Sequence, residues 1–184
     1  MSTLVMIHLN ARLRPLDRGD HYEDPLLEAL EQRAPGSDVV GGGTLLSGEG
    51  EPASADIELD LTGDVEAGVA LVVDTLEAAG APQGSTVRVG DADPVPFGAS
   101  EGLGLYLNGT DLPAEVYATN DVNDLIAQLL DALGDAGGMQ SWWHGPRELA
   151  LYLYGPSSDR MRELIAPVLA SHPLAERSRL VPLT

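Results

Sequence analysis

The sequence contains an internal repeat, and this repeat restricts the possible folds more than any other feature. Residues 8–15 align with residues 106–113, where Leu-Asn and a closing Pro recur at an offset of 98. Residues 56–63 align with residues 148–155 at an offset of 92. In both halves the expected order of elements is strand, helix, strand, strand, helix, strand. The chain is therefore expected to be two copies of one small α+β unit.

Residue periodicity predicts the elements of each half. Strict alternation of apolar and polar residues predicts strands, and apolar residues at helical spacing predict helices. Asp64, Asn120 or Asp121, and Ser157 or Ser158 are residue types that suit helix N-caps. The first half is expected to hold strands 3–13, 38–46, 55–61 and 85–89, a helix over 24–32, and a second helix after Asp64. The second half is expected to hold strands 102–107, 139–144, 147–154 and 179–183, with the two helices starting near 121 and 158.

This element order predicts the fold class. Two tandem ferredoxin-like βαββαβ units are expected, each with an antiparallel sheet and its helices on one face. The domain boundaries are expected at residues 1–92 and 102–184, with residues 93–101 as a junction rich in Asp and Pro. The second unit is expected to pack on the first, because a unit of about 90 residues alone buries too little surface.

Charge excludes several kinds of partner. The 184 residues include 29 acidic and 10 basic side chains, all ten of them Arg, for a net charge of −19. Such a surface repels phosphate backbones and anionic membranes, so no nucleic-acid or membrane partner is expected. Three origins of the acidity stay open: a GC-rich genome, adaptation to salt, or recognition of a basic partner. Without a signal peptide or a spanning apolar stretch, a cytoplasmic location is expected.

Motifs for catalysis and cofactor binding are missing. The sequence has no phosphate-binding loop, dinucleotide fingerprint, zinc-protease motif or nucleophile elbow. The absence of Cys excludes disulfides, thiol catalysis and Cys-type zinc sites. Asp20, His21 and Asp24 lie in a charged segment, 16–24, which is interpreted as a solvated loop because no second ligand follows at helical spacing. No catalytic residue, cofactor or metal is therefore predicted.

The face of each sheet opposite the helices is the candidate binding surface. In the first unit, outward positions of two adjacent strands carry charges of both signs, and Arg12 is expected to pair with Glu58 or Asp60. Trp142 and Trp143 are possible interface anchors, of which only one can face inward. The predicted partner-binding residues are Glu49, Glu51, Asp56, Glu58, Asp60, Trp142 and Trp143. An alternative ligand-binding set is His8, Asn10, Arg12, Tyr106, Asn108 and Tyr152.

The sequence resembles small bacterial proteins in its L-N-A-R-L segment near the N-terminus and its W-W-x-G-x-x-E-x-A-L-Y-L-Y-G segment near the C-terminus. In size, charge and α+β plan it also resembles the small acidic immunity proteins of bacterial polymorphic toxin systems. That resemblance implies a non-enzymatic protein that binds and neutralises a basic toxin domain. Two alternatives stay open: a small enzyme or ligand-binding protein that uses the open sheet face or the cleft between units, and a structural homodimer.

Overall fold

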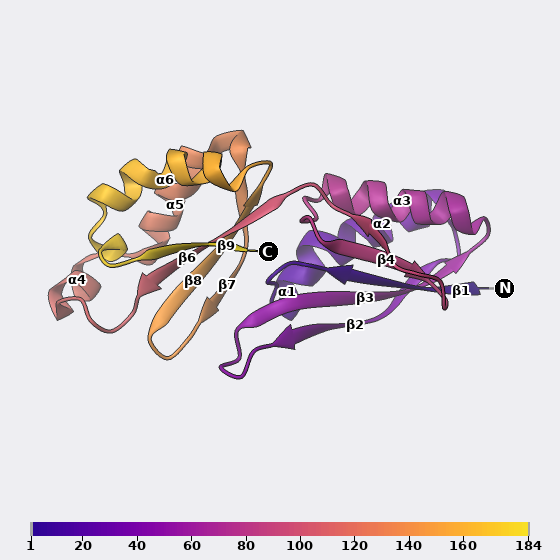
Figure 1. Cartoon of the computed structure of the whole chain (residues 1–184), viewed down its shortest axis with the longest axis horizontal. Coiled ribbons are helices and arrows are strands. Elements are labelled where there is room, and N and C mark those ends of the chain that lie inside the picture. The colour runs from indigo at the N-terminus through magenta and orange to yellow at the C-terminus, as the bar shows by residue number, and fades with distance from the viewer. Residues whose placement is uncertain (1, 184) are drawn as a thin grey trace. The chain divides into compact units, whose positions relative to one another are not determined.

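Alternating apolar residues build the sheet of the first unit. The computed structural model describes residues 2–183, and the first unit extends to Ser100 (Figure 1). Ile7 lies opposite Ile57 and Val5 lies opposite Leu59 in the antiparallel ladder, and all four side chains are buried. The strands are β1 (Ser2–Leu9), β2 (Asp38–Leu46), β3 (Pro52–Thr62), β4 (Ser85–Val89) and β5 (Val95–Phe97), in the order β2-β3-β1-β4-β5.

Two longer helices cover one face of this sheet. They are α2 (Asp24–Arg33) and α3 (Val65–Ala78), which lie side by side on the same side of the strands (Figure 1). Asp64 is the N-cap of α3, because its carboxylate accepts a hydrogen bond from the Ala67 amide at 3.1 Å. The helices bury Leu26, Leu30, Leu71, Val72 and Leu76. The other sheet face is left without helices.

The segment expected to be a loop at 16–24 is helical instead. It forms α1 (Pro15–Arg18) and a π-helical turn, η1 (Gly19–Glu23), that leads into α2. Two ion pairs hold it: the Arg14 guanidinium bonds both carboxylate oxygens of Asp17, and Arg18 Nε donates to Glu23 at 2.5 Å. Tyr22 is fully buried beneath this turn. The mixture of charges that suggested a solvated loop therefore pairs internally and stabilises a helical turn.

The second unit spans Glu101–Leu183 and repeats the plan. Leu103 and Leu105 on the central strand pack with Leu125, Leu129 and Ile165 of the helices in one apolar core. The strands are β6 (Glu101–Asn108), β7 (Gly138–His144), β8 (Glu148–Gly155) and β9 (Arg179–Leu183), in the order β7-β8-β6-β9. The helices are α4 (Ala114–Thr119), α5 (Val122–Leu133) and α6 (Ser158–Ser171), with short turns η2 (Gly134–Ala136) and η3 (Pro173–Ala175).

Both sheets have the ferredoxin-like order, so the predicted fold class is confirmed. In each unit the fourth strand of the motif pairs with the first, the first with the third and the third with the second, all antiparallel. Asp121 and Ser157 are the N-caps of α5 and α6. None of the helices within residues 2–183 is long and apolar enough to cross a membrane.

Three features of the fold differ from the sequence prediction: the end of β1, the expected junction and helix α4. β1 ends at Leu9 rather than at residue 13, although Ala11 and Leu13 are still fully buried. The expected junction at 93–101 contains β5, which pairs with β4 and belongs to the first unit. The prolines of this segment hid the strand, since proline is tolerated only at a sheet edge. Helix α4 was not expected, because six residues are too few to show a period.

Candidate functional site

Four carboxylates gather on the open face of the first sheet, and we call them the acidic face: Asp38, Asp56, Glu58 and Asp60. On β3, the last three alternate with buried Ile57 and Leu59, so they point away from the helices. Asp38 is exposed and the other three are partly exposed. The alternation that forms the hydrophobic core therefore also places Asp56, Glu58 and Asp60 together, as the sequence predicted, whereas Asp38 was not among the predicted site residues.

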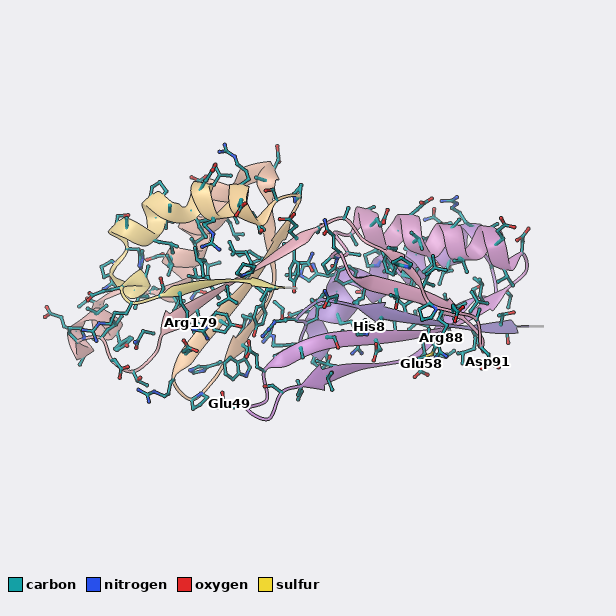
Figure 2. All side chains as sticks on the ribbon, in the orientation of Figure 1. His8, Glu49, Glu58, Arg88, Asp91 and Arg179 are labelled. Carbon is teal, nitrogen blue, oxygen red and sulfur yellow. The ribbon has the colours of Figure 1, made fainter. Side chains whose placement is uncertain are left out.

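The strand register defines the neighbours of each carboxylate. On the β2 side, Glu58 lies opposite Gly41, and a Cβ added to that glycine would stand 3.0 Å from Glu58 Oε2. The Glu58 side chain therefore leans over the glycine toward the edge of the sheet. On the β1 side, His8 Nδ1 lies 2.8 Å from Asp56 Oδ1. Arg88 on β4 reaches the same face, opposite Met6 (Figure 2).

Two acids of the acidic face are direct cross-strand neighbours. Asp38 on β2 lies opposite Asp60 on β3 in the antiparallel ladder. Like charges at such positions reduce the stability of a sheet, by about 0.2–1 kcal/mol. Neither carboxylate has a hydrogen bond or ion pair within the described residues 2–183. Asp38 and Asp60 thus hold negative charge on this face without a compensating internal contact, whereas Asp56 has His8 beside it.

The turn between β2 and β3 carries the two other predicted acids. Ser47 Oγ accepts hydrogen bonds from the amides of Glu49 and Glu51, so the turn is ordered. Glu49 is exposed, whereas the Glu51 carboxylate pairs with Arg12. The prediction that Arg12 pairs with Glu58 or Asp60 was wrong. The strand register is the reason, since Glu58 lies opposite Met6 and Asp60 lies opposite Leu4, well before Arg12 in the chain.

The two tryptophans belong to the second unit and face opposite ways on β7. Trp142 lies opposite buried Leu151, and Trp143 lies opposite Ala150. Trp142 is exposed at 36%, and Trp143 is partly buried. A Cβ on Gly145 would stand 2.1 Å from the Trp143 ring, so the indole occupies the space above that glycine. Trp142 is therefore the more accessible of the two.

Both asparagines of the alternative ligand set have structural bonds. Asn10 Nδ2 donates to the Gln83 carbonyl at 2.9 Å. Asn108 Oδ1 accepts from the amides of Thr110 and Asp111 at 3.0 and 2.7 Å. The repeated Leu-Asn pair therefore fastens the chain after the first strand of each unit, with different partners in the two halves. This role explains the repeat without a ligand.

The face of the second sheet opposite its helices has a different chemistry, and its tyrosines Tyr106, Tyr152 and Tyr154 are buried. Tyr106 and Tyr152 meet edge to face with ring centroids 6.4 Å apart, and the Arg179 guanidinium lies 3.8 Å from the Tyr106 centroid. Arg179 also forms two hydrogen bonds of 2.8 Å to Glu148. Sequence reasoning missed Arg179, although the predicted strand order placed its strand beside that of Tyr106. This face is aromatic and internally paired.

The register also shows that the acidic face has no counterpart in the second unit. His8 lies opposite Asp56, and Tyr106 lies opposite Ala150. Stepping along the two ladders, Glu58 corresponds to Tyr152 and Asp60 corresponds to Tyr154. The acidity of the first unit at these positions is therefore a local difference between two units that share one fold.

The pKa values of three carboxyls are lowered in the second unit. Hydrogen bonds from Arg179 lower the pKa of Glu148. Bonds from Asn108 and Thr110 lower the pKa of Asp111. The backbone amide of Ser158, together with its hydroxyl, lowers the pKa of Glu101. Glu101 thus fixes the start of α6 from a position 57 residues earlier in the chain. These carboxylates have structural roles.

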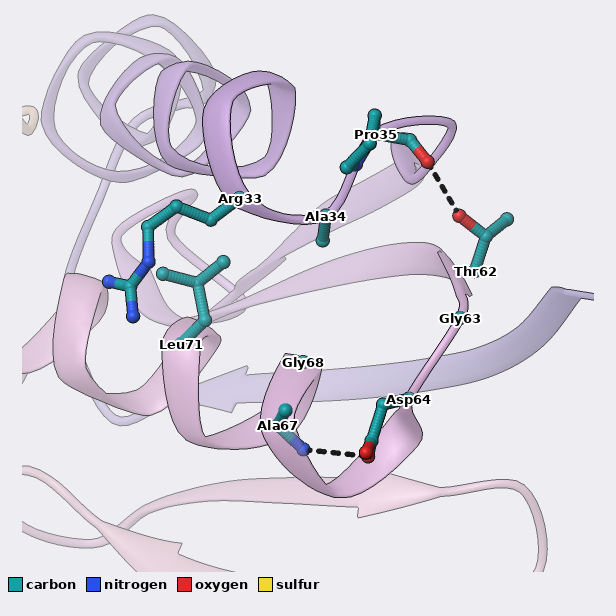
Figure 3. A pocket seen from close by; sticks show the side chains of 9 residues that line it. All are labelled: Arg33, Ala34, Pro35, Thr62, Gly63, Asp64, Ala67, Gly68 and Leu71. Atoms are coloured by element: carbon teal, nitrogen blue, oxygen red, sulfur yellow. Dashed lines mark hydrogen bonds between the residues drawn. The ribbon is translucent and has the colours of Figure 1, made fainter.

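A hollow of about 330 Å³ lies on the helix side of the first unit, where α2 ends and α3 begins (Figure 3). Two of its polar side chains already have internal partners, since Thr62 Oγ1 donates to the Pro35 carbonyl and Asp64 caps α3. None of the predicted site residues lines it. No group of three His, Asp or Glu side chains among residues 2–183 is arranged to hold a metal ion. The acidic face is therefore the candidate site.

No protein-family model and no curated protein matches this chain. Among solved structures, an unknown protein from Galdieria sulphuraria is 12% identical with a TM-score of 0.33, covering 100% of this chain and 98% of its own. The ligand-free regulatory subunit of aspartate kinase from Thermus thermophilus is 9% identical with a TM-score of 0.29, covering 92% and 93%. Both TM-scores are below 0.5, so these likenesses assign neither a family nor an activity.

Proposed function

We propose that this chain is a non-enzymatic binding protein whose acidic face docks a basic partner protein. The observation that carries the proposal is the set of four carboxylates on one open sheet face. At the three positions on β3 the related second unit has neutral side chains. A bias in genome composition or salt adaptation acts on the whole surface and does not require this difference between the two units.

The sheet makes these charges effective for binding. β3 is paired on both sides, by β2 and β1, so its carboxylates are held at fixed spacing before any partner arrives. Preorganised charge reduces the ordering cost of association. Complementary charge also speeds encounter and disfavours wrong partners. The net charge of −19 extends this attraction beyond the face itself.

The more specific form of the proposal is an immunity protein that neutralises a basic toxin domain. Support comes from the small size, the strong acidity and the exposed acidic face, which suit tight and fast capture of a cationic protein. On this proposal Glu49, at the exposed turn beside β3, provides a further contact. Glu51 contributes less, because Arg12 already neutralises it.

Co-expression with the secreted toxins of neighbouring genes tests this function. The wild-type chain should protect cells, and the triple variant Asp56→Asn, Glu58→Gln, Asp60→Asn should lose protection. A control triple variant on the exposed helix surface removes the same charge: Glu31→Gln, Glu66→Gln and Asp74→Asn.

Circular dichroism should show that both triple variants fold. Equal loss of protection in both would show that bulk charge, rather than the acidic face, matters. The absence of protection and of any salt-sensitive binding to a basic partner would reject the proposal.

A further inference from the structure

The outer edge of β2 is an unpaired strand edge next to the acidic face. β2 is the first strand in the order β2-β3-β1-β4-β5, and no other strand within residues 2–183 pairs with its outer side. An edge strand presents a row of backbone donors and acceptors that another strand can pair with. The opposite edge, β5, is only three residues long and contains Pro96. β2 is nine residues long, so it offers much more backbone to a partner.

β2 lacks most of the devices that usually protect an edge. Such devices are prolines, basic side chains and inward-pointing charges. The strand reads Asp-Val-Val-Gly-Gly-Gly-Thr-Leu-Leu, with a single charge at its first residue. Its apolar side chains are unusually accessible: Val40 is 53%, Leu45 is 62% and Leu46 is 54% exposed. A bulge between Val39 and Gly41 is its one irregularity near the start.

The glycines of β2 connect this edge to the carboxylates of β3. Gly41 and Gly43 lie opposite Glu58 and Asp56 on the open face. Because glycine has no side chain, the space above β2 between its outer edge and these two carboxylates is not filled at these positions. A strand added to β2 would lie about 4.8 Å from it and roughly 10 Å from β3. The Glu58 side chain already leans over Gly41 toward that edge. A long basic side chain from the added strand can therefore meet Glu58 above the glycine.

We infer that β2 accepts an extended basic segment of the partner protein by strand addition. This inference rests on the proposed function and specifies its geometry. Backbone hydrogen bonds along β2 provide affinity, and alternate Arg or Lys side chains of the added strand recognise the acidic face. The side chains between them point to the other side of the sheet. The recognised partner is thus a cationic protein with an exposed strand or a segment that becomes one.

The same charges disfavour a second copy of this chain at the edge. If two β2 strands paired, the acidic faces of both copies would lie side by side in one continuous sheet. Asp38 and Glu58 of each copy would then add to a single negative surface, which opposes association. A basic occupant removes this repulsion, so charge selects the partner.

Synthetic peptides test the inference with the full-length chain. The probe has nine residues, with Arg at alternate positions and Val or Thr between them, and both ends blocked. One derivative carries N-methyl groups on the Arg residues and another carries them on the intervening residues. In a strand the amides of these two sets point to opposite edges. Fluorescence anisotropy should therefore show at least about tenfold weaker binding for the derivative whose methylated amides face β2, because it loses several backbone hydrogen bonds. The other derivative should bind almost as well as the unmethylated peptide.

Protein variants and amide exchange complete the test. Glu58→Gln should weaken peptide binding about two- to fivefold, and the matched control Glu31→Gln on α2 should leave it unchanged. The peptide should slow hydrogen exchange at β2 amides while leaving α3 unaffected. Equal binding of all three peptides, still weakened by Glu58→Gln, would overturn strand addition and leave acidic-face docking standing.

Two further results would count against the inference. Protection from a toxin in co-expression, without binding of any peptide, would reject strand addition alone. Concentration-dependent dimerisation that protects the β2 amides without peptide would show that a second copy occupies the edge. Failure of every peptide together with failure of protection would reject the proposed function as well.

Discussion

Replacing Asp60 with Asn should make the first unit more stable while weakening its binding. Asp60 lies opposite Asp38, and residues in such positions have Cβ atoms about 5 Å apart, which puts the carboxylates at about 6 Å. At that distance two charges in water repel by about 0.7 kcal/mol. Screening at physiological salt roughly halves this value. We therefore expect Asp60→Asn to raise the free energy of unfolding by about 0.5 kcal/mol in 10 mM salt and about half as much in 150 mM salt.

Urea unfolding at both salt concentrations measures this effect. Asp38→Asn should give a similar gain, and the double variant should gain little more, because either substitution alone removes the repulsion. Binding to a basic partner should weaken in the same variants. A loss of stability on Asp60→Asn at low salt would refute the reasoning, because it would mean that the carboxylate makes a favourable contact in the folded state.

Three other substitutions test the structure. Tyr22→Ala should cost about 3–5 kcal/mol in urea unfolding, because the buried ring fills the core beneath η1; a cost below about 1 kcal/mol would contradict that packing. Asp121→Ala should cost about 1 kcal/mol by removing the N-cap of α5, and an unchanged midpoint would argue against the cap. The pKa of Glu148 is lowered from 4.5, so its stabilisation is present above the unfolded-state pKa and lost as pH falls through the folded-state value. Glu148→Gln should therefore flatten the loss of stability below about pH 4.5, and parallel profiles would refute this.

The repeat and the apolar alternation were enough to predict the fold, because alternating apolar residues show which face of each strand is buried. Ser85–Val89 and Arg179–Leu183 form strands with the predicted bounds. The same alternation placed Asp56, Glu58 and Asp60 on one face, since residues two apart must share a side. Neither prediction required knowledge of which distant segments are in contact.

Features that depend on tertiary partners could not be predicted in the same way. The helical turn before α2 depends on the ion pair of Arg18 with Glu23. In the sequence alone, these charged residues indicate a solvent-exposed loop. The pairing of Arg12 with Glu51 depends on the register of β1 against β3, which sets Met6 opposite Glu58 and which periodicity does not reveal. The lean of Glu58 over Gly41 depends on the rotamer of one side chain. No pattern in the sequence encodes these three contacts.

Strand β5 and the residues that follow it affect how the first unit could be produced alone. The amides of Ala99 and Ser100 both donate to the Ala81 carbonyl, and the Gln83 amide donates to the Ser100 carbonyl. Glu101 then begins β6 directly. A fragment ending at residue 92, where composition suggests a boundary, would lose these bonds and expose the edge of β4 to intermolecular pairing. A fragment ending at Ser100 keeps these bonds. Its C-terminal residues should therefore resist proteolysis.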